Sequence, residues 1–239
     1  MRFGSHQQLA ILAMTLMIGQ IFRPPLARAQ SAPVQSSLHA ASAAKTKLTL
    51  RVYNYARLDS ASLALSESVA AEIFEHVGIQ IAWVDCPLSS KEFLAYPQCQ
   101  SRMQPTDLVL RVLPRHMAMK LHHRYEALGF AQTCPETEPA CELNVFYHRV
   151  DELAAKGYRG DRILGHAIAH EISHVLIGPH HSEEGIMRGE WTHQDLQLIS
   201  SGLSLDFTKD QSSQIQNAVL RRSSPSIQKG IMQANLFAQ

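Results

Sequence analysis

The residues best suited to chemistry lie in one short stretch, where His170, Glu171 and His174 form the pattern His-Glu-x-x-His and two more histidines follow at positions 180 and 181. On an α-helix of 3.6 residues per turn, residues four apart share a face, so His170 and His174 can hold two corners of a tetrahedral Zn²⁺ site. Glu171 can accept a proton from water at such a metal. The pattern therefore predicts a zinc site for metal-assisted hydrolysis.

The helix that must carry this motif is predicted over 161–177. Asp161 lies in its first turn, where a negative charge complements the helix dipole, and Gly178 and Pro179 end it one turn after His174. Apolar residues at helical spacing give it a broad apolar surface, formed by Ile163, Leu164, Ala167, Ile168, Ile172, Val175 and Leu176. The chain must turn at Gly178, as the arrival of a third ligand from a loop requires.

Hydrophobic periodicity predicts the elements around this helix. Alternating apolar residues indicate strands over 48–55, 79–84, 107–113, 128–132 and 143–147. Capping residues and helical spacing indicate a helix that Asp59 or Ser60 caps and Gly78 ends, one that Thr192 caps and that runs to about Ser201, and a polar one over 209–222. Long loops are predicted over 86–105 and 115–127.

Other histidines were candidates for the site. His116, His122 and His123 lie in the polar stretch 115–127, which we expect to be solvated, because none has a spacing to a partner ligand. His166 lies four residues before the motif, on nearly the same helix face. We expect it to be a partly exposed helix histidine, since three histidines and a water already fill a zinc sphere. A hydrogen-bonding role behind the ligands, or a place among them, is the alternative.

The first residues have the features of a secretory signal peptide. Arg2 precedes an apolar run over 9–22, and Ala27-Arg28-Ala29 forms an A-x-A cleavage site, which predicts residues 1–29 as the signal peptide. A membrane anchor is the alternative, but the run is short for a span and two prolines follow it. We then expect a disordered linker over 30–46, a folded domain over 47–222 and a flexible tail over 223–239.

Composition argues against two classes of partner. The formal net charge is +1 and charged residues make up 18% of the chain, so neither a nucleic-acid surface nor an anionic-membrane surface is indicated. A length of 239 residues is enough for one domain with a full core. We expect a secreted or periplasmic monomer that acts on a peptide or protein substrate and has no membrane contact after signal cleavage.

The cysteines are consistent with export. All four, Cys86, Cys99, Cys134 and Cys141, lie in the predicted mature chain, and an even number in an exported protein indicates disulfides. Three pairings are possible. We favour Cys86–Cys99 with Cys134–Cys141, because each bond then closes one loop. Zinc ligation by cysteine is the competing interpretation, but the chain has no C-x-x-C spacing to support it.

A chance match is the competing interpretation of the His-Glu-x-x-His pattern. It would leave a helix with two exposed histidines. Four features favour metal binding instead: the amphipathic helix, the Gly-Pro stop, a histidine beyond the stop, and export.

The same stretch resembles the signature of the metzincin metallopeptidases, H-E-x-x-H-x-x-G-x-x-H followed by a Met-turn. It departs from that signature at Ile177, which stands where the family has glycine, and Gly178 comes one place late. Counted from His174, the third ligand falls on His180; counted from Gly178, it falls on His181. We favour His181, because the tight turn should travel with the glycine.

The resemblance has further implications. It implies that Met187 is the Met-turn methionine beneath the metal, with an ordinary core methionine as the alternative. The segment 181–187 is also similar to short-loop, secreted bacterial proteins of this type. The strand over 128–132 would lie at the sheet edge and pair with an extended peptide, so that Leu128, Gly129, Phe130 and Ala131 line the substrate. The implied fold is α+β: a twisted mixed β-sheet with two long helices, an active-site helix that ends at a glycine turn, and a small C-terminal helical part.

The resulting hypothesis is a secreted zinc metallopeptidase. His170, His174 and His181 would bind one Zn²⁺, and the open fourth position would hold water. Glu171 would take a proton from this water as it attacks a peptide carbonyl, and would return it to the leaving amine. Two other functions stay open: a non-catalytic module that zinc stabilises, and an exported, disulfide-stapled binding protein whose motif is accidental.

Overall fold

The computed structural model describes residues 46–121 and 127–224. The predicted signal peptide, the predicted linker up to residue 45, His122, His123 and the predicted tail from residue 225 onward lie outside the described residues. Thr46, which we assigned to the linker, is the first residue of a strand. Among the helices that the structure describes, none is long and apolar enough to cross a membrane.

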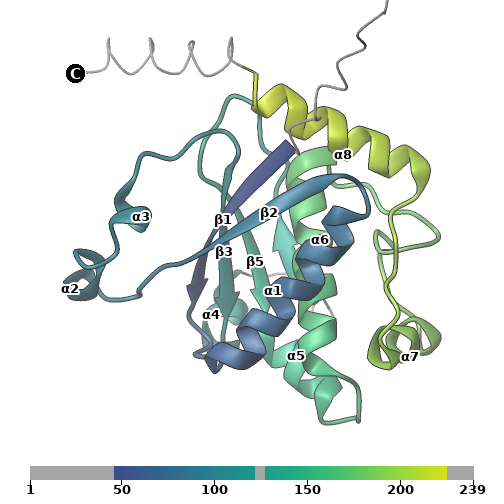
Figure 1. Cartoon of the computed structure of the whole chain (residues 1–239). Coiled ribbons are helices and arrows are strands. Elements are labelled where there is room, and N and C mark those ends of the chain that lie inside the picture. Colours follow the sequence, from purple (N-terminus) through teal and green to yellow (C-terminus); the bar gives the residue numbers. More distant parts are fainter. Residues whose placement is uncertain (1–45, 122–126, 225–239) are drawn as a thin grey trace, which may run out of the picture. The chain divides into compact units, whose positions relative to one another are not determined.

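A mixed sheet of five strands organises the described chain, in the order β2-β1-β3-β5-β4 (Figure 1). The strands are β1 (Thr46–Asn54), β2 (Ile79–Asp85), β3 (Asp107–Leu113), β4 (Gly129–Ala131) and β5 (Cys141–Phe146). β1 pairs in parallel with β2 and β3, and β3 pairs in parallel with β5. Only β4, at the edge, is antiparallel, with Gly129 opposite Val145. All five strands lie where alternation predicts them, but Tyr147 begins a helix instead of ending the fifth.

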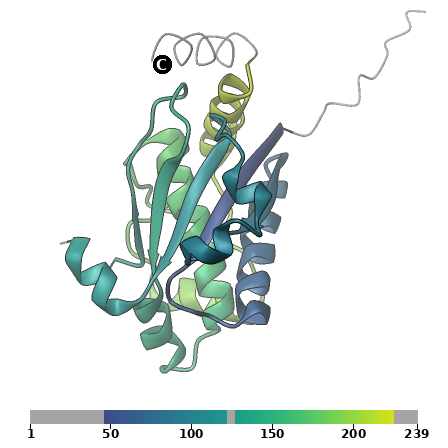
Figure 2. The same cartoon turned by 90° about the vertical axis from the view of Figure 1, so that its left-hand side faces the viewer.

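Two long helices, α1 (Ser60–Glu75) and α6 (Gly160–Ile177), lie on one side of the sheet (Figures 1 and 2). Alternate residues of the strands point at them and are fully buried, including Leu50, Leu110 and Val145. The helices approach closely at Gly165, where an added Cβ would lie 2.6 Å from the backbone oxygen of Ser66. This packing fixes α6, and therefore the motif, against the sheet.

The smaller helices include several that periodicity does not indicate. α5 (Tyr147–Ala154) directly follows β5, while α7 (His193–Ser201) and α8 (Lys209–Arg222) agree with prediction. The predicted loop 86–105 contains two single-turn helices, α2 (Ser90–Phe93) and α3 (Pro97–Gln100). The start of the predicted loop 115–127 is α4 (Arg115–Ala118) with the 3₁₀ turn η1 (Met119–Leu121). Our loop assignments were wrong there, because helices of four residues are too short to show a period.

Candidate metal centre

The site begins with four side chains spaced four residues apart along α6: Arg162, His166, His170 and His174. Such spacing places them in a stripe on one face. The helix ends at Gly178, whose φ of 101° is a conformation that side chains disfavour, and whose N–H donates to the backbone oxygen of His174. The glycine thus ends the helix as predicted and turns the chain toward His180 and His181.

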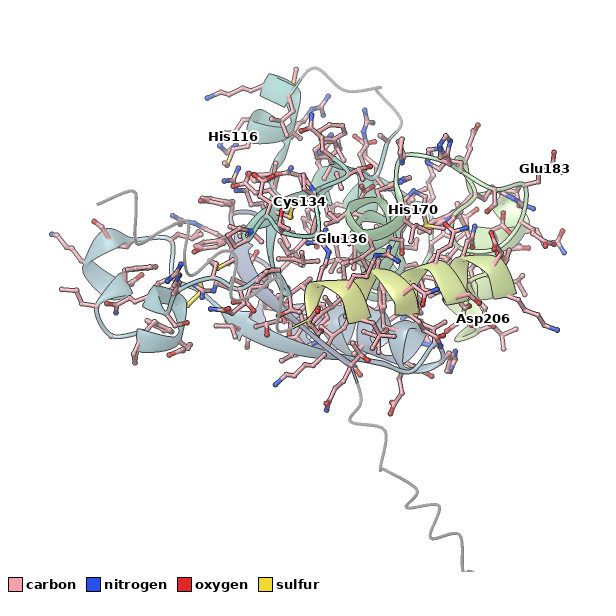
Figure 3. The ribbon with its side chains drawn as sticks, turned by 90° about the horizontal axis from the view of Figure 1, so that it is seen from above. His116, Cys134, Glu136, His170, Glu183 and Asp206 are labelled. Carbon is pink, nitrogen blue, oxygen red and sulfur yellow. A yellow bond between two sulfur atoms is a disulfide. The ribbon has the colours of Figure 1, made fainter. Side chains whose placement is uncertain are left out.

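Three imidazoles converge beyond this turn. Nε2 of His174 lies 3.0 Å from Nε2 of His170 and 3.2 Å from Nε2 of His181, and one ligand atom from each residue lies within 4.8 Å of the others. In a tetrahedral site with Zn–N distances of about 2.0–2.1 Å, ligand nitrogens are separated by about 3.3 Å. The separations in the cluster therefore suit one zinc ion. Figure 3 shows His170 among the side chains around α6, whereas Glu183, on the following loop, lies at the periphery.

The other ring nitrogens show that the imidazoles of His170 and His174 can offer lone pairs to a cation. Nδ1 of His170 lies 2.8 Å from the carbonyl oxygen of Ile186, and Nδ1 of His174 lies 2.9 Å from that of Gly178. A carbonyl only accepts, so each Nδ1 carries the hydrogen and each neutral ring has its lone pair on Nε2. Burial lowers the pKa of His170 to about 4 and also lowers that of His174, which keeps both rings neutral at pH 7. Two lone pairs facing each other at 3.0 Å repel, and a cation between them would be ligated by both.

Glu171 lies beneath the edge strand. It is 5% exposed, and its Oε2 has no hydrogen-bond partner among the residues that the structure describes. Burial raises the pKa of this carboxyl to about 8. An added Cβ at Gly129 of β4 would lie 2.7 Å from Oε1 of Glu171 and 2.7 Å from the backbone oxygen of Asn144. Only glycine therefore lets β4 approach the carboxyl so closely, and a nearby cation would favour the ionised form.

The loop after α6 brings His181 to the cluster, while His180 is exposed and outside it. The loop closes on itself, since the N–H of Ser182 donates to the carbonyl of Met187 at 2.9 Å. Arg188 holds its outer part, donating to the carbonyl of Glu183 at 2.8 Å and pairing with Asp195 of α7 at 2.6 Å. The ring of His181 is thereby held 5.3 Å from that of His170, centroid to centroid.

The predicted Met-turn and substrate-lining residues lie outside the cluster of three imidazoles. Met187 is fully buried in the loop, one residue after the carbonyl that His170 engages. The residues predicted to line substrate, Leu128, Gly129, Phe130 and Ala131, are half-buried at the sheet edge. Their roles beneath the metal and along a substrate stay predictions.

His166 corrects our expectation of a partly exposed histidine, because it is fully buried. Its Nδ1 lies 2.8 Å from the carbonyl of Arg162, and its Nε2 accepts from the N–H of Leu205 at 3.2 Å. Burial lowers its pKa to about 4. Both ring nitrogens have protein partners, so this imidazole offers no lone pair to a metal. The apolar period of α6 could have indicated burial, but the partner lies 39 residues away in sequence.

Trp191 is a residue near the site that sequence reasoning missed. Its Nε1 donates to the carbonyl of Ile186 at 3.1 Å, the same carbonyl that His170 engages. Its ring centroid lies 6.1 Å from those of both His166 and His170, edge to face. Nothing in the spacing of a single tryptophan four residues after Met187 signals these contacts.

The cysteines lie at disulfide distance in the local pairs that the sequence favours, Cys86–Cys99 and Cys134–Cys141. The second pair lies near the site, since the N–H of Cys134 points to the carbonyl of Val175 on α6 at 3.4 Å. The buried guanidinium of Arg222 on α8 donates to the carbonyl of Cys134 at 2.7 Å. The disulfide joins the segment after β4 to the first residue of β5, and the N–H of Cys134 links that segment to α6.

Comparison with protein-family models finds no match, and comparison with curated proteins finds none either. Among solved structures, the chain is similar to the crystal structure of archaemetzincin from Methanopyrus kandleri, with 14% sequence identity and a TM-score of 0.41. The similar region covers 73% of this chain and 97% of that one. A likeness this distant assigns no function, so the function has to be argued from the side chains of the site.

Proposed function

We propose that this protein is an exported, metzincin-like zinc peptidase in which His170, His174 and His181 bind one Zn²⁺ and Glu171 is the general base. The observation that carries the proposal is the convergence of three imidazole nitrogens within 4.8 Å, two of them on rings whose other nitrogen faces a backbone carbonyl. Rings held in this way present lone pairs to a common point. That arrangement suits a metal ion, whereas without one the converging lone pairs only repel each other.

Zinc held by these three imidazoles would supply Lewis acidity, which polarises a carbonyl and lowers the pKa of water to about 7. The protein supplies the proton transfer. Glu171 is buried beside β4, and its pKa is about 8 in the metal-free protein. A nearby cation would lower this pKa, because it favours the ionised carboxylate. A carboxyl with a pKa near the working pH can take a proton from water and pass it to the leaving amine.

The edge strand suits a peptide substrate. Among the described strands, β4 is the last of the sheet and has β5 as its neighbour. An extended peptide can add to the outer edge of such a strand through backbone hydrogen bonds. Because Gly129 brings this strand against Glu171, a peptide bound along Leu128–Ala131 would run past the carboxyl. The proposed substrates are accordingly peptides or unfolded protein segments, met by a monomer in the periplasm or outside the cell.

One observation favours a non-catalytic zinc module instead. Glu171 is only 5% exposed, so β4 closes over the group that should meet water. In that alternative, zinc would tie α6 to the loop around His181, and its removal would unfold the protein without any activity to lose.

The test is hydrolysis of a mixed peptide library by the mature protein, beside its zinc content, with and without chelator. Glu171→Ala should retain one zinc per chain and lose about 100-fold to 10,000-fold in kcat, the usual contribution of a positioned base. The exposed His180→Gln is the matched control and should retain both zinc and activity. A Glu171→Ala protein that is as active as the wild type would exclude the proposed role, and an inactive but zinc-stabilised wild type would favour the module.

A further inference from the structure

The first two side chains of the α6 stripe, Arg162 and His166, hold the backbone at the end of α7 and the loop that follows it. Arg162 donates to the carbonyls of Ile199, at 3.2 Å, and Gly202, at 2.6 Å. One helical turn later, Nε2 of the buried His166 accepts from the N–H of Leu205 at 3.2 Å. The backbone from α7 to Leu205 is thus fastened to the same helix face that carries the candidate ligands.

This loop in turn holds the backbone of Ile186, whose carbonyl His170 engages. The carbonyl of Asp206 accepts from the N–H of Ile186 at 3.1 Å. The neighbouring Gly185 has a φ of +71°, and a Cβ there would collide with the Asp206 carbonyl, so the two backbones approach as closely as glycine allows. The carbonyl of Ile186 accepts from both His170 and Trp191. Both backbone polar groups of Ile186, its N–H and its carbonyl, are therefore held.

We propose that His166 and Trp191 are positioning residues of the metal centre, acting through the backbone of Ile186. His166 fixes the loop that receives the Ile186 N–H, and Trp191 fixes the direction of the Ile186 carbonyl. That carbonyl keeps the hydrogen of His170 on Nδ1 and leaves Nε2 free for the metal. The inference rests on the proposed zinc site and adds residues outside the motif to it.

The hydrogen bonds distinguish this role from simple core packing. A leucine would fill much of the volume of the His166 ring, but it would leave the N–H of Leu205 without its acceptor. A phenylalanine would retain an aromatic ring, though a smaller one, against His170 and would remove the Nε1 donor. Each residue thus has a substitution that keeps part of the packing and deletes the proposed contact.

The experiment measures zinc affinity by competition with a chromophoric chelator for the wild type, His166→Leu, His166→Gln and Trp191→Phe. Loss of a contact behind a metal ligand usually costs 10-fold to 100-fold in affinity, and we expect about that range for His166→Leu and about 10-fold for Trp191→Phe. His166→Gln should restore most of the affinity, because its amide can still accept from Leu205. Val219→Ala, a buried change on α8, is the control for general destabilisation.

A second readout follows the tautomer of His170 in the metal-free protein by ¹⁵N NMR of its imidazole. The wild type should show hydrogen on Nδ1, and Trp191→Phe should show a mixture of tautomers. If His166→Leu fails to fold, Trp191→Phe still decides the question. Affinities for zinc that are unchanged in a zinc-binding protein, or that fall equally in Val219→Ala, would overturn the positioning role and leave the zinc site standing. A wild type that binds no zinc would overturn both.

Discussion

Two histidines one turn apart on α6 have the same residue type, the same burial effect on pKa and different surroundings. His166 and His170 each hold a backbone carbonyl with Nδ1, at 2.8 Å in both cases. Nε2 of His166 accepts from the N–H of Leu205, whereas Nε2 of His170 faces another imidazole nitrogen. The group opposite the second nitrogen therefore separates a structural histidine from a candidate ligand, and neither the lowered pKa nor the helix position does so.

The contrast extends to the two halves of α6. The N-terminal half fastens α7 and its loop through Arg162 and His166, and it packs closely on α1 at Gly165. The C-terminal half ends in the glycine turn and presents His170 and His174 to the cluster. Substitutions in the first half should act mainly on folding and on ligand alignment, and substitutions in the second half should act on the metal itself.

The largest expected effect is that of His174→Ala, which removes the central nitrogen of the cluster. Zinc affinity should fall by more than the 100-fold or so that marks the upper end for contacts behind a ligand. Chelator competition measures it, and His166→Gln is the matched substitution on the same stripe. Equal losses of zinc affinity in the two variants would contradict the different roles assigned to His166 and His174.

Next in size is Gly129→Ala, which places a methyl 2.7 Å from Oε1 of Glu171. The strand or the carboxyl must shift, and a displacement of about 1 Å at a catalytic group costs on the order of 100-fold in kcat/KM. Zinc content should stay at the wild-type level, because the atoms nearest to the added methyl belong to Glu171 and Asn144. Peptide hydrolysis beside metal analysis checks this, and full activity would show that β4 does not set the position of Glu171.

Gly165→Ala probes the structural half of the helix. Its added Cβ would lie 2.6 Å from the Ser66 oxygen and 2.6 Å from Cβ of Val69, so α1 and α6 must separate. Such overpacking costs about 1–3 kcal/mol in the free energy of unfolding, measurable by urea denaturation. Gly160→Ala is the control, since its Cβ would come no nearer than 3.2 Å to Ala154. A Gly165→Ala protein with wild-type stability but poor zinc affinity would reverse the roles of the two halves.

The smallest expected effect is that of replacing Glu67, a buried carboxyl outside the candidate metal centre. Burial, together with the charge of Asp85, raises the pKa of Glu67 on α1 from 4.5 to about 8, far from the histidines in sequence. The folded protein therefore binds more protons than the unfolded chain between these pH values, and stability falls as pH rises through that window. In Glu67→Gln, the free energy of unfolding should gain on the order of 1 kcal/mol relative to wild type between pH 5 and pH 8. An identical pH dependence in both proteins would contradict the shift.

The sequence predicts those features of the structure that depend on local residue patterns. Alternation located all five strands, and the spacing of apolar residues with Gly178 located α6 and its end. The motif likewise named His170 and His174 from their spacing. The contacts of His166 and Trp191 were beyond this reach, because a pattern along one helix does not say which distant N–H or carbonyl the fold brings to it. α5 was missed for a local reason: it follows β5 without a capping side chain and has a single fully buried residue, Val150.

The most direct test of the central claim is zinc K-edge X-ray absorption of the purified mature protein. We predict stoichiometric zinc with three imidazole nitrogens and one oxygen at about 2.0–2.1 Å. Absence of bound zinc, or a shell of sulfur at about 2.3 Å, would contradict the histidine site.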